Sequence, residues 1–482
     1  MSSILCAINN RLFSRSEKPK IVDWLLFIVI CLISFLLFCQ GGDLNITAQH
    51  SVILLDATIH GQFFHFYTYV YDLVSKGGSS SPAYYSVFLY GTFSIWNLPL
   101  WLFSKITGIA INSFVLMMWS KTLILVCTLY SGYLVYKIGL TLKMAINKSK
   151  WMMFVYLTSP ILMFGTVIFG QYDIFGVVAT LLGILMFLKK KPYQFAMFMA
   201  LAISYKNFAA LIFIPLILLT EKSVFHIIKY YAIGFSLFLL QNIVFFLSDP
   251  GYVKVQVEGE STYGFFHSVF TYGLPSGYGV SSYIGITFMI LCAFAYRKNI
   301  KNAFELGQYT IYIPLVIYGV FFAFLGWHPQ WVVILVPYMV IAAFNCKDFK
   351  LSMFIDIAMS IGYMLMSMIK YVDNVDQNMI NAGILPKLFH VSYDNSVTFA
   401  DIATKAHIPY ELLITLFVGA IFVNIIIKFP GLNKNTNVNE LKEETTFVPE
   451  RSVLWVRALS IFIFILPTLV LYFHFLIKNY LI

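Results

Sequence analysis

The chain has 482 residues, of which 60% are hydrophobic and 11% are charged, and its formal net charge is +10. A soluble domain carries roughly a quarter charged residues, so this composition excludes a soluble globular domain and predicts a protein embedded in lipid. The basic residues lie in short loops between apolar runs, which indicates a membrane-orientation signal and no nucleic-acid partner. The 6 cysteines show no CxxC spacing, so neither a zinc site nor a disulfide framework is expected.

Long apolar runs recur along the chain and set the expected fold. A transmembrane helix needs about 20 apolar residues, and by this criterion the sequence predicts an all-α, polytopic transmembrane bundle of about 13 spans. In chain order these are residues 21–39, 114–138, 151–169, 174–188, 193–203, 208–219, 225–247, 282–296, 309–325, 331–344, 351–369, 412–427 and 454–475. The first run lacks a small-residue cleavage site, so it is expected to be a span and no signal peptide.

Lysine and arginine occupy alternate loops between these runs. The loops hold Arg11, Arg15, Lys18 and Lys20, then Lys143, Lys148 and Lys150, then Lys189, Lys190 and Lys191, then Arg297, Lys298 and Lys301, then Lys347 and Lys350, and then Lys428 and Lys434. With a cytoplasmic N-terminus all of them fall inside, as the positive-inside rule requires. The compact loops and the lack of a disulfide pattern favour a bacterial inner or plasma membrane over the endoplasmic reticulum.

Three long loops, residues 40–113, 248–281 and 370–411, then lie outside and indicate work on the extracytoplasmic face. Residues 84–103 are apolar, but a span there would move the lysines at 189–191 outside. We therefore expect an amphipathic helix on the outer membrane surface, with a true span as the alternative. Residues 47–71 carry apolar side chains at helical spacing and predict a second juxtamembrane helix.

Two carboxylate clusters lie at the predicted outer face. Asp43 follows Gly41-Gly42 directly after the first span, where a carboxylate could accept a proton from an attacking hydroxyl, or could simply cap the next helix. Gln49, His50 and Asp56 follow it in the first outer loop. The tight turn Gly170-Gln171-Tyr172-Asp173 holds Gln171 and Asp173 near the bilayer surface, with helix capping by Asp173 as the alternative.

Three basic side chains lie at the same predicted depth. They are Lys121 inside the second run, Lys206 between two short runs, and His328 in Gly326-Trp327-His328-Pro329-Gln330-Trp331. Short broken segments are typical of binding cavities at membrane depth, and cations there suit a membrane-anchored phosphate. The alternatives are snorkelling of the lysines to the headgroups and helix capping by His328. The second outer loop adds Glu258 and His267 among tyrosines, a composition that suits sugars but is also common in wet loops.

These clusters, in this order, resemble the GT-C superfamily of integral membrane glycosyltransferases, which use polyprenyl-phosphate sugars. Members share a first span followed by a large outer loop with an acidic residue near its start, which here looks like Gly42-Asp43. A basic residue in the second span, a tight acidic outer turn and a later lysine are similar to Lys121, to Gly170-Gln171-Tyr172-Asp173 and to Ser204-Tyr205-Lys206-Asn207. A histidine before an aromatic residue and a proline-containing span looks like His328-Pro329-Gln330-Trp331.

The resemblance implies an inverting sugar transfer from a polyprenyl-phosphate donor to a glycan or glycolipid acceptor of the cell envelope. Asp43 would be the general base, and Lys121, Lys206 and His328 would bind the donor phosphate. The acceptor or sugar would contact Gln49, His50, Asp56, Gln171, Asp173, Glu258 and His267. No metal is expected to be essential, although some relatives use a divalent cation. Residues 1–430 would form the catalytic module, and residues 431–482 a polar cytoplasmic loop and a final span. Many members end in a soluble outer domain, whereas this chain ends soon after Phe475, so the acceptor stays open.

Three other functions compete with this reading. A transporter or flippase of lipid-linked glycans would share the helix count, but it predicts inverted repeats that the sequence does not show clearly. A polysaccharide polymerase or ligase typically depends on arginines in outer loops, and the predicted outer loops contain none. A purely structural membrane protein is the third. The sequence names neither the sugar, the acceptor nor the oligomeric state.

Overall fold

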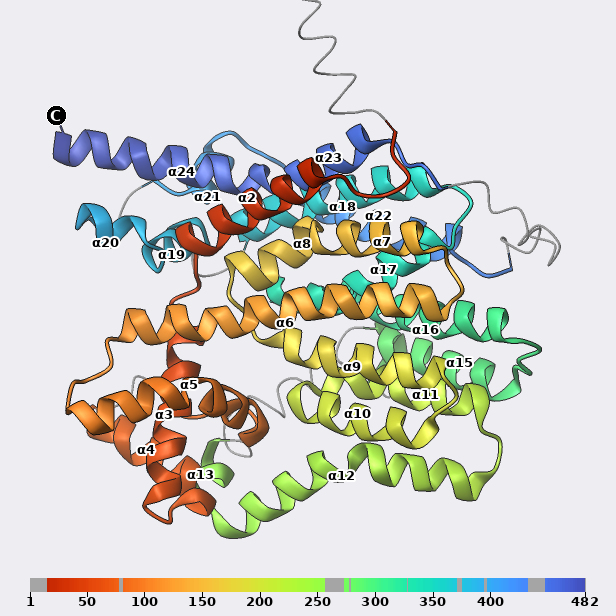
Figure 1. The fold of residues 1–482 in the computed structure, drawn as a ribbon, viewed down its shortest axis with the longest axis horizontal. Helices are drawn as coiled ribbons and strands as arrows, with labels where there is room; N and C mark the ends of the chain where they lie inside the picture. The colour runs from red at the N-terminus through yellow and green to blue at the C-terminus, as the bar shows by residue number, and fades with distance from the viewer. Residues whose placement is uncertain are drawn as a thin grey trace, which may run out of the picture.

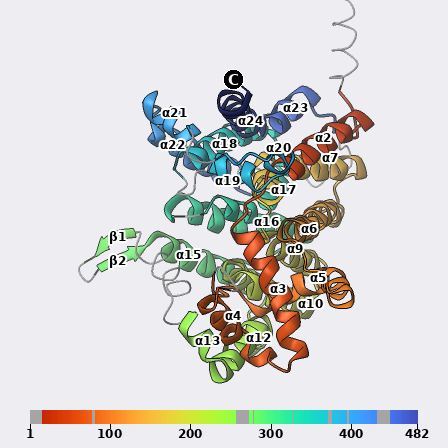
Figure 2. The same ribbon diagram turned by 90° about the vertical axis from the view of Figure 1, so that its left-hand side faces the viewer.

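The protein is built almost entirely of helices in a computed structural model, which describes residues 15–77, 81–255, 273–276, 279–326, 328–370, 375–393, 397–431 and 447–481 (Figure 1). The sheet found in these ranges is one antiparallel hairpin of β1 (Gly273–Ser276) and β2 (Gly279–Ser282), in which Gly273 lies opposite Ser282. Figure 2 shows this hairpin projecting beside α15 (Tyr283–Arg297). The all-α prediction is confirmed for the described residues.

The helices follow one another through short connections. Up to the first long loop they are α2 (Ile21–Leu37), α3 (Asp43–Ile59), η1 (Phe63–His65), α4 (Phe66–Ser75), α5 (Val87–Thr107), α6 (Ser113–Thr141), α7 (Ile146–Leu157), α8 (Pro160–Leu162), η2 (Met163–Ile168), α9 (Asp173–Leu188), α10 (Pro192–Tyr205), η3 (Asn207–Ala209), α11 (Ala210–Thr220), α12 (Val224–Ser248) and α13 (Pro250–Val253). After α15 they are α16 (Ala303–Phe324), η5 (Pro329–Ile334), α17 (Val336–Phe344), α18 (Phe349–Lys370), α19 (Val375–Asn381), α20 (Leu385–Phe389), α21 (Phe399–Lys405), α22 (Tyr410–Ile427), α23 (Arg451–Leu459), α24 (Phe462–Leu476) and η7 (Ile477–Leu481).

Each of the predicted apolar runs coincides with a helical segment, but fewer of these segments are long enough to be spans. Within the described residues 6 helices are long and apolar enough to cross a membrane: α6, α12, α16, α18, α22 and the combined final helix Arg451–Tyr480. A seventh is added if α7 and the following Pro160–Ile168 are one span bent by 45°. The expected count of about 13 spans is therefore not confirmed, because several apolar helices have fewer than 18 residues. The protein is a helical membrane protein.

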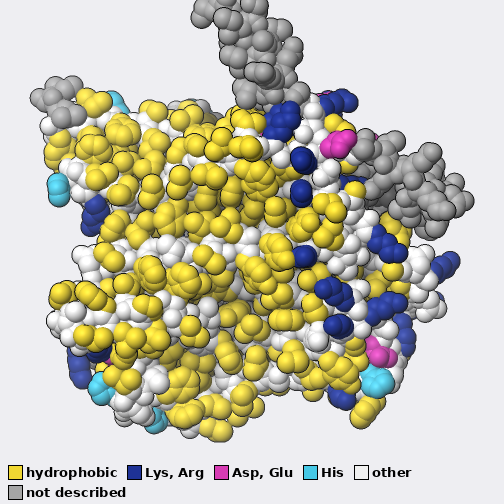
Figure 3. Space-filling view, in the orientation of Figure 1, with side chains coloured by type: hydrophobic (Ala, Val, Ile, Leu, Met, Phe, Trp, Pro, Cys, Tyr) yellow, Lys and Arg dark blue, Asp and Glu magenta, His cyan; other side chains and the backbone are white. Residues whose placement is uncertain are grey.

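Burial separates central helices from peripheral ones. Every residue of α17 is buried, and α9 is buried along nearly its whole length. In contrast, α12 buries only Ile227, Tyr230, Gly234 and Phe245 among its 25 residues. A helix that is apolar on all sides and central packs against protein, whereas an apolar and exposed helix such as α12 suits contact with lipid. Figure 3 shows the resulting broad hydrophobic surface on the face in view.

The bundle has two chemically different ends. The turns after α6, α9, α15 and α17 lie at the right edge of Figure 1, and most of the lysine and arginine visible in Figure 3 gathers at this edge, here named the basic end. Helices α3, α4, α5 and α13 cluster at the opposite edge, here named the α3 end. The segregation agrees with the alternation of basic loops seen in the sequence.

The α3 end holds both predicted juxtamembrane segments as helices. The segment predicted at residues 84–103 is α5, which packs on α3 and α6 and is not among the helices long and apolar enough to cross a membrane. Its contact with α6 includes stacked rings of Trp96 and Trp119, with centroids 5.6 Å apart. Asp249 joins this end to α12, because its carboxylate accepts from the backbone N–H groups of Tyr67 at 2.8 Å and Thr68 at 2.9 Å.

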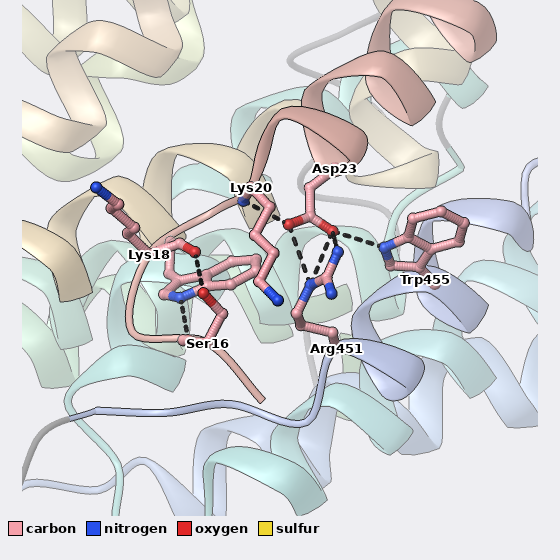
Figure 4. A network of polar contacts seen from close by, with 7 residues as sticks. Ser16, Lys18, Lys20, Asp23, Arg451 and Trp455 are labelled. Carbon is pink, nitrogen blue, oxygen red and sulfur yellow. Dashed lines mark hydrogen bonds and ion pairs between the residues drawn. The ribbon is translucent and has the colours of Figure 1, made fainter. Parts of the chain in front are cut away.

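The final helix is packed into the same core as the first one. Asp23 of α2 is fully buried and accepts hydrogen bonds from Arg451 Nη2 and from Trp455 Nε1, each at 2.7 Å (Figure 4). Further along, Arg457 Nε is paired with Asp356 of α18. These buried ion pairs fasten α23 to α2 and α18, so residues after 446 belong to the packed bundle.

Candidate active site

Asp43 begins α3 directly after the turn that follows α2. In this turn Cys39 N donates to Met379 O at 2.8 Å and Gln40 N donates to Phe169 O at 3.0 Å, which ties the connection to neighbouring segments. The Gln40 side-chain oxygen accepts from Asp43 N at 2.6 Å. The N-cap position is Gly42, so Asp43 is not the cap, and its half-buried carboxylate is available for other contacts.

Gln171 holds the carboxylate of Asp43 from the turn before α9. Its Nε2 donates to Asp43 Oδ2 at 2.9 Å. Gly170 makes this turn possible, because its φ is +76°, a left-handed conformation that side chains rarely adopt. A Cβ at Gly170 would also lie 3.1 Å from Leu44 and 3.3 Å from the sulfur of Cys39. The local backbone therefore sets the position of Gln171 against Asp43.

Asp173 and Lys206 form an ion pair next to the hydrogen bond between Gln171 and Asp43. Asp173 is the first residue of α9, where the helix dipole favours a carboxylate, and Lys206 is the residue that ends α10. Lys206 Nζ lies 2.8 Å from Asp173 Oδ1, and the two side chains are 21% and 3% exposed. The other oxygen, Asp173 Oδ2, is buried and has no hydrogen-bond partner among the described residues. The N-cap of α9 is Tyr172, so capping does not account for Asp173.

Aromatic rings surround the ammonium of Lys206. Its Nζ lies 5.2 Å from the ring centroid of Trp331 and 5.8 Å from that of Phe208. The ring of His328 lies 5.0 Å from that of Trp331. His328 is exposed and therefore stands at the outer rim of this group. The structure thus brings two of the three predicted cations, Lys206 and His328, to one place through Trp331.

An apolar pocket opens beside Lys206. Its walls come from α9, α10, η3, α16, η5 and α17, with Lys206 among the lining residues, which also include Val177, Ile334 and Tyr338. A cation on the wall of an otherwise apolar pocket suits a ligand that joins an anionic group to a hydrocarbon.

Two tyrosines, the buried Tyr172 and the half-buried Tyr85, lie near Asp43. Tyr85 and Tyr172 meet with ring centroids 5.1 Å apart. Burial, followed by the charge of Asp43, raises the pKa of Tyr85 well above its usual value. The pKa of Tyr172 is also raised well above its usual value, first by burial and then by the nearby Tyr85 and Asp43. Both phenols therefore stay protonated at neutral pH beside Asp43 and keep an O–H to donate.

Lys121 lies beside Gly170, next to the turn that carries Gln171 and Asp173, but its ammonium is bound by α2. It is fully buried in α6, and its Nζ donates to the carbonyl oxygens of Phe35, at 2.7 Å, and Phe38. These carbonyls lie at the end of α2, where a cation is favourable. The contacts with α2 account for the burial of this ammonium, and binding of the donor phosphate by Lys121 stays a prediction.

His50 and Gln49 lie further along α3. His50 is 1% exposed, its Nε2 lies 3.0 Å from Ser81 O, and its ring packs against Tyr90 at 5.6 Å. Gln49 Nε2 donates to Asn45 Oδ1 one turn earlier at 3.2 Å. Neither side chain is joined to Asp43 by a contact that the structure records, so a role in sugar binding stays a prediction for both.

Asp56 fastens α3 to α5. Its Oδ1 accepts from Trp101 Nε1 at 2.9 Å and lies 2.7 Å from Lys105 Nζ. These contacts give Asp56 a packing role at the far end of α3. Glu258 and His267 lie outside the described residues. Among the residues that are described, no three His, Cys, Asp or Glu side chains are grouped as metal ligands would be, and the metal requirement stays a prediction.

The sequence matches no described protein family and no curated protein.

Two contributors to the site, Gln40 and Tyr85, were not singled out from the sequence. Gln40 is the first residue of the predicted outer loop, and Tyr85 falls in the predicted interfacial helix at residues 84–103. Tyr85 gains its importance from segments far away in the chain, so spacing alone carries no signal for it. Gln40 stands three residues before Asp43, which is the one local hint that its side chain could bond the start of the helix.

Proposed function

We propose that the protein is an inverting glycosyltransferase that transfers a sugar from a polyprenyl-phosphate donor to a glycan or glycolipid acceptor. The supporting observation is that one three-residue turn carries two contacts: Gln171 donates a hydrogen bond to Asp43, and Asp173 forms an ion pair with Lys206. Because the Cα atoms of Gln171 and Asp173 are at most about 7 Å apart, a base and a phosphate-binding cation share one site.

The donor would bind through Lys206. Its ammonium can pair with the phosphate, and the adjoining apolar pocket can take the first part of the hydrocarbon chain. His328 at the rim adds a second group that can hydrogen-bond to the phosphate. Trp331 lies between them and offers a ring face against which a sugar can pack.

The reaction would be a single displacement. The acceptor hydroxyl gives its proton to Asp43 while its oxygen forms a bond to the anomeric carbon, and the bond from that carbon to the phosphate oxygen breaks. The electron pair of the broken bond stays on the lipid phosphate, whose growing charge is balanced by Lys206. Attack on the side opposite to the phosphate inverts the configuration.

Asp173 would serve both partners of the reaction. Its Oδ1 fixes the position of Lys206, and its unpaired Oδ2 can accept a hydrogen bond from a hydroxyl of the acceptor or the sugar. A buried carboxylate oxygen without a partner is costly, which favours the arrival of such a donor.

The site would face the extracytoplasmic side. Asp43 and its partners lie near the α3 end, opposite the basic end, and basic loops of membrane proteins stay in the cytoplasm. The N-terminus would then be cytoplasmic. A bacterial inner or plasma membrane provides polyprenyl-phosphate sugars on this face.

A transfer assay tests the proposal. Purified protein in lipid is given undecaprenyl- or dolichyl-phosphate sugars together with candidate glycan acceptors, and release of lipid phosphate is followed. Turnover that is lost in Lys206→Met and kept in Asp72→Asn supports the proposal, because Asp72 is an exposed residue of α4 outside the site. If no donor releases sugar while labelled donor crosses the bilayer, the protein is a translocator of lipid-linked sugars and the proposal fails.

A further inference from the structure

A second pocket lies at the basic end, far from the candidate active site along the bundle. This pocket, here named the Lys428 pocket, is lined by Gln308, Ile311, Tyr312, Ala342, Asn345, Lys428 and Pro430. Gln308 lies in the first two turns of α16, Asn345 ends α17, and Lys428 ends α22. Figure 1 shows these helix ends at the edge where Figure 3 shows lysine and arginine to gather.

The ammonium of Lys428 is buried with little compensation. The residue is 6% exposed, and its Nζ donates to Met339 O at 3.1 Å. That carbonyl is the one hydrogen-bond acceptor recorded for it in the described part of the chain, so two of its three donors are unused there. No carboxylate of the described residues forms an ion pair with it. A buried cation in this state is costly unless an anion joins it.

The carboxylate of Asp356, which interacts electrostatically with Lys428, is already paired with another cation. Asp356 is paired with Arg457, whose Nη1 also donates to Val155 O at 2.7 Å. Arg457 Nη2 is buried and has no hydrogen-bond partner among the described residues. Asp356 and Arg457 both lie within electrostatic range of Lys428. Two cations and one carboxylate leave this region with one excess positive charge.

The two amide side chains of the pocket are also free to bind. Gln308 and Asn345 are half-buried, and neither side chain makes a hydrogen bond with the other described residues. Each amide can donate two hydrogen bonds. One ammonium and two amides on the wall of one pocket offer hydrogen-bond donors to the several acceptor oxygens of a phosphate group.

We propose that the Lys428 pocket binds a phosphate group, carried by an anionic lipid headgroup or by a soluble phosphate compound. The site is independent of the proposed transfer reaction, because it lies at the opposite end of the bundle and shares no residue with it. Bound phosphate would neutralise Lys428 and join α16, α17 and α22 at their ends, which would stabilise the bundle.

Binding to purified full-length protein in a neutral detergent tests this site. The probes are phosphatidic acid, phosphatidylcholine with the same acyl chains, and inorganic phosphate, each titrated and followed by native mass spectrometry and thermal unfolding. Phosphatidic acid should bind Lys428→Met at least about tenfold more weakly than wild type, the loss expected for a charged hydrogen bond. Lys347→Met, which removes an exposed lysine two residues beyond Asn345, should bind as wild type does.

Asn345→Asp provides a second variant that leaves Lys428 in place. A carboxylate at this position should repel phosphate and abolish the same binding. Binding of phosphatidic acid alone identifies a lipid ligand, and equal protection by inorganic phosphate identifies a soluble one. If wild type, Lys428→Met and Asn345→Asp respond alike to every probe, the pocket is no phosphate site. If Lys428→Met lowers the unfolding temperature but no probe binds wild type more tightly than the variant, Lys428 serves only to bind the Met339 carbonyl, and the proposal fails.

Discussion

Lys206 Nζ lies 2.8 Å from Asp173 Oδ1, and this pair joins the end of α10 to the start of α9 with the carboxylate only 3% exposed. Asp173 is the first residue of α9 and Lys206 follows the last residue of α10, so the pair fixes how these two helix termini meet. The same lysine lies on the wall of the apolar pocket, and its partner follows the turn that holds Asp43. The same ion pair therefore stabilises the fold and positions the lysine that is proposed to bind the donor.

Lys206→Met should destabilise the protein by about 2 kcal/mol, between the limits for exposed and fully buried pairs, because Asp173 loses its partner. Thermal and denaturant unfolding in detergent measure this change. Lys105→Met is the control, since it breaks a pair with Asp56 of 2.7 Å whose side chains are 48% and 25% exposed, and it should cost less than about 1 kcal/mol. Equal effects of the two variants would refute a special role for the Asp173 pair.

Gln171→Leu should lower kcat by about tenfold or more and leave the KM for the donor nearly unchanged, because the hydrogen bond that positions Asp43 is lost. Gln171→Glu should be worse, since it places a second carboxylate against Asp43. Steady-state kinetics of both variants test this order. Lys206→Met serves as the contrast, because it should raise the KM for the donor as well as lower kcat. A rise in KM with unchanged kcat in Gln171→Leu would contradict the positioning role.

Asp23→Ala should destabilise the protein by about 3–5 kcal/mol, because Arg451 would stay buried without its carboxylate. Its double variant with Arg451→Met should lose much less than the sum of the two single changes. Arg15→Gln is the matched control, since Arg15 and Glu450 form a pair with side chains 68% and 34% exposed, and less than about 1 kcal/mol is expected there. If Asp23→Ala, the double variant and Arg15→Gln all have the same free energy of unfolding, the contacts of Asp23 in Figure 4 do not stabilise the protein.

The stability of the protein should fall between about pH 6.5 and pH 4 because of His50. Burial lowers the pKa of His50 to about 4 from 6.5, with the Ser81 carbonyl contact acting in the opposite sense. In this window the unfolded chain binds the proton and the folded chain does not, so stability rises with pH, by at most about 3 kcal/mol in total. Unfolding midpoints across this range should flatten in His50→Gln and keep their slope in His65→Gln, whose residue is exposed. An unchanged slope in His50→Gln would reject this assignment.

The helices could be predicted from apolar runs, because every such run became a helical segment. The number of spans could not be predicted in the same way. The run predicted at residues 151–169 contains Pro160, which breaks the helix and bends it by 45°, and α10 and α11 are divided at Lys206. Hydrophobic composition defines where a helix forms, whereas its length depends on such breaks.

The candidate site was partly visible in the sequence. The acidic turn at Gln171 and Asp173 and the broken segment at Lys206 were singled out because charges are costly at membrane depth. Their pairing was not visible, since Gln171 bonds Asp43 across 128 positions of the chain. Lys121 looked equally suited to phosphate, and only the folded chain shows that the carbonyls at the end of α2 receive its ammonium.

The most direct test of the proposed reaction is the transfer rate of Asp43→Asn with a saturating polyprenyl-phosphate sugar. This substitution keeps the size of the side chain and the start of α3 but removes the proton acceptor. A fall in kcat by about 10²–10⁴ with unchanged donor binding and unfolding temperature is the predicted result. Turnover equal to that of wild type would show that Asp43 is not the base and would contradict the mechanism.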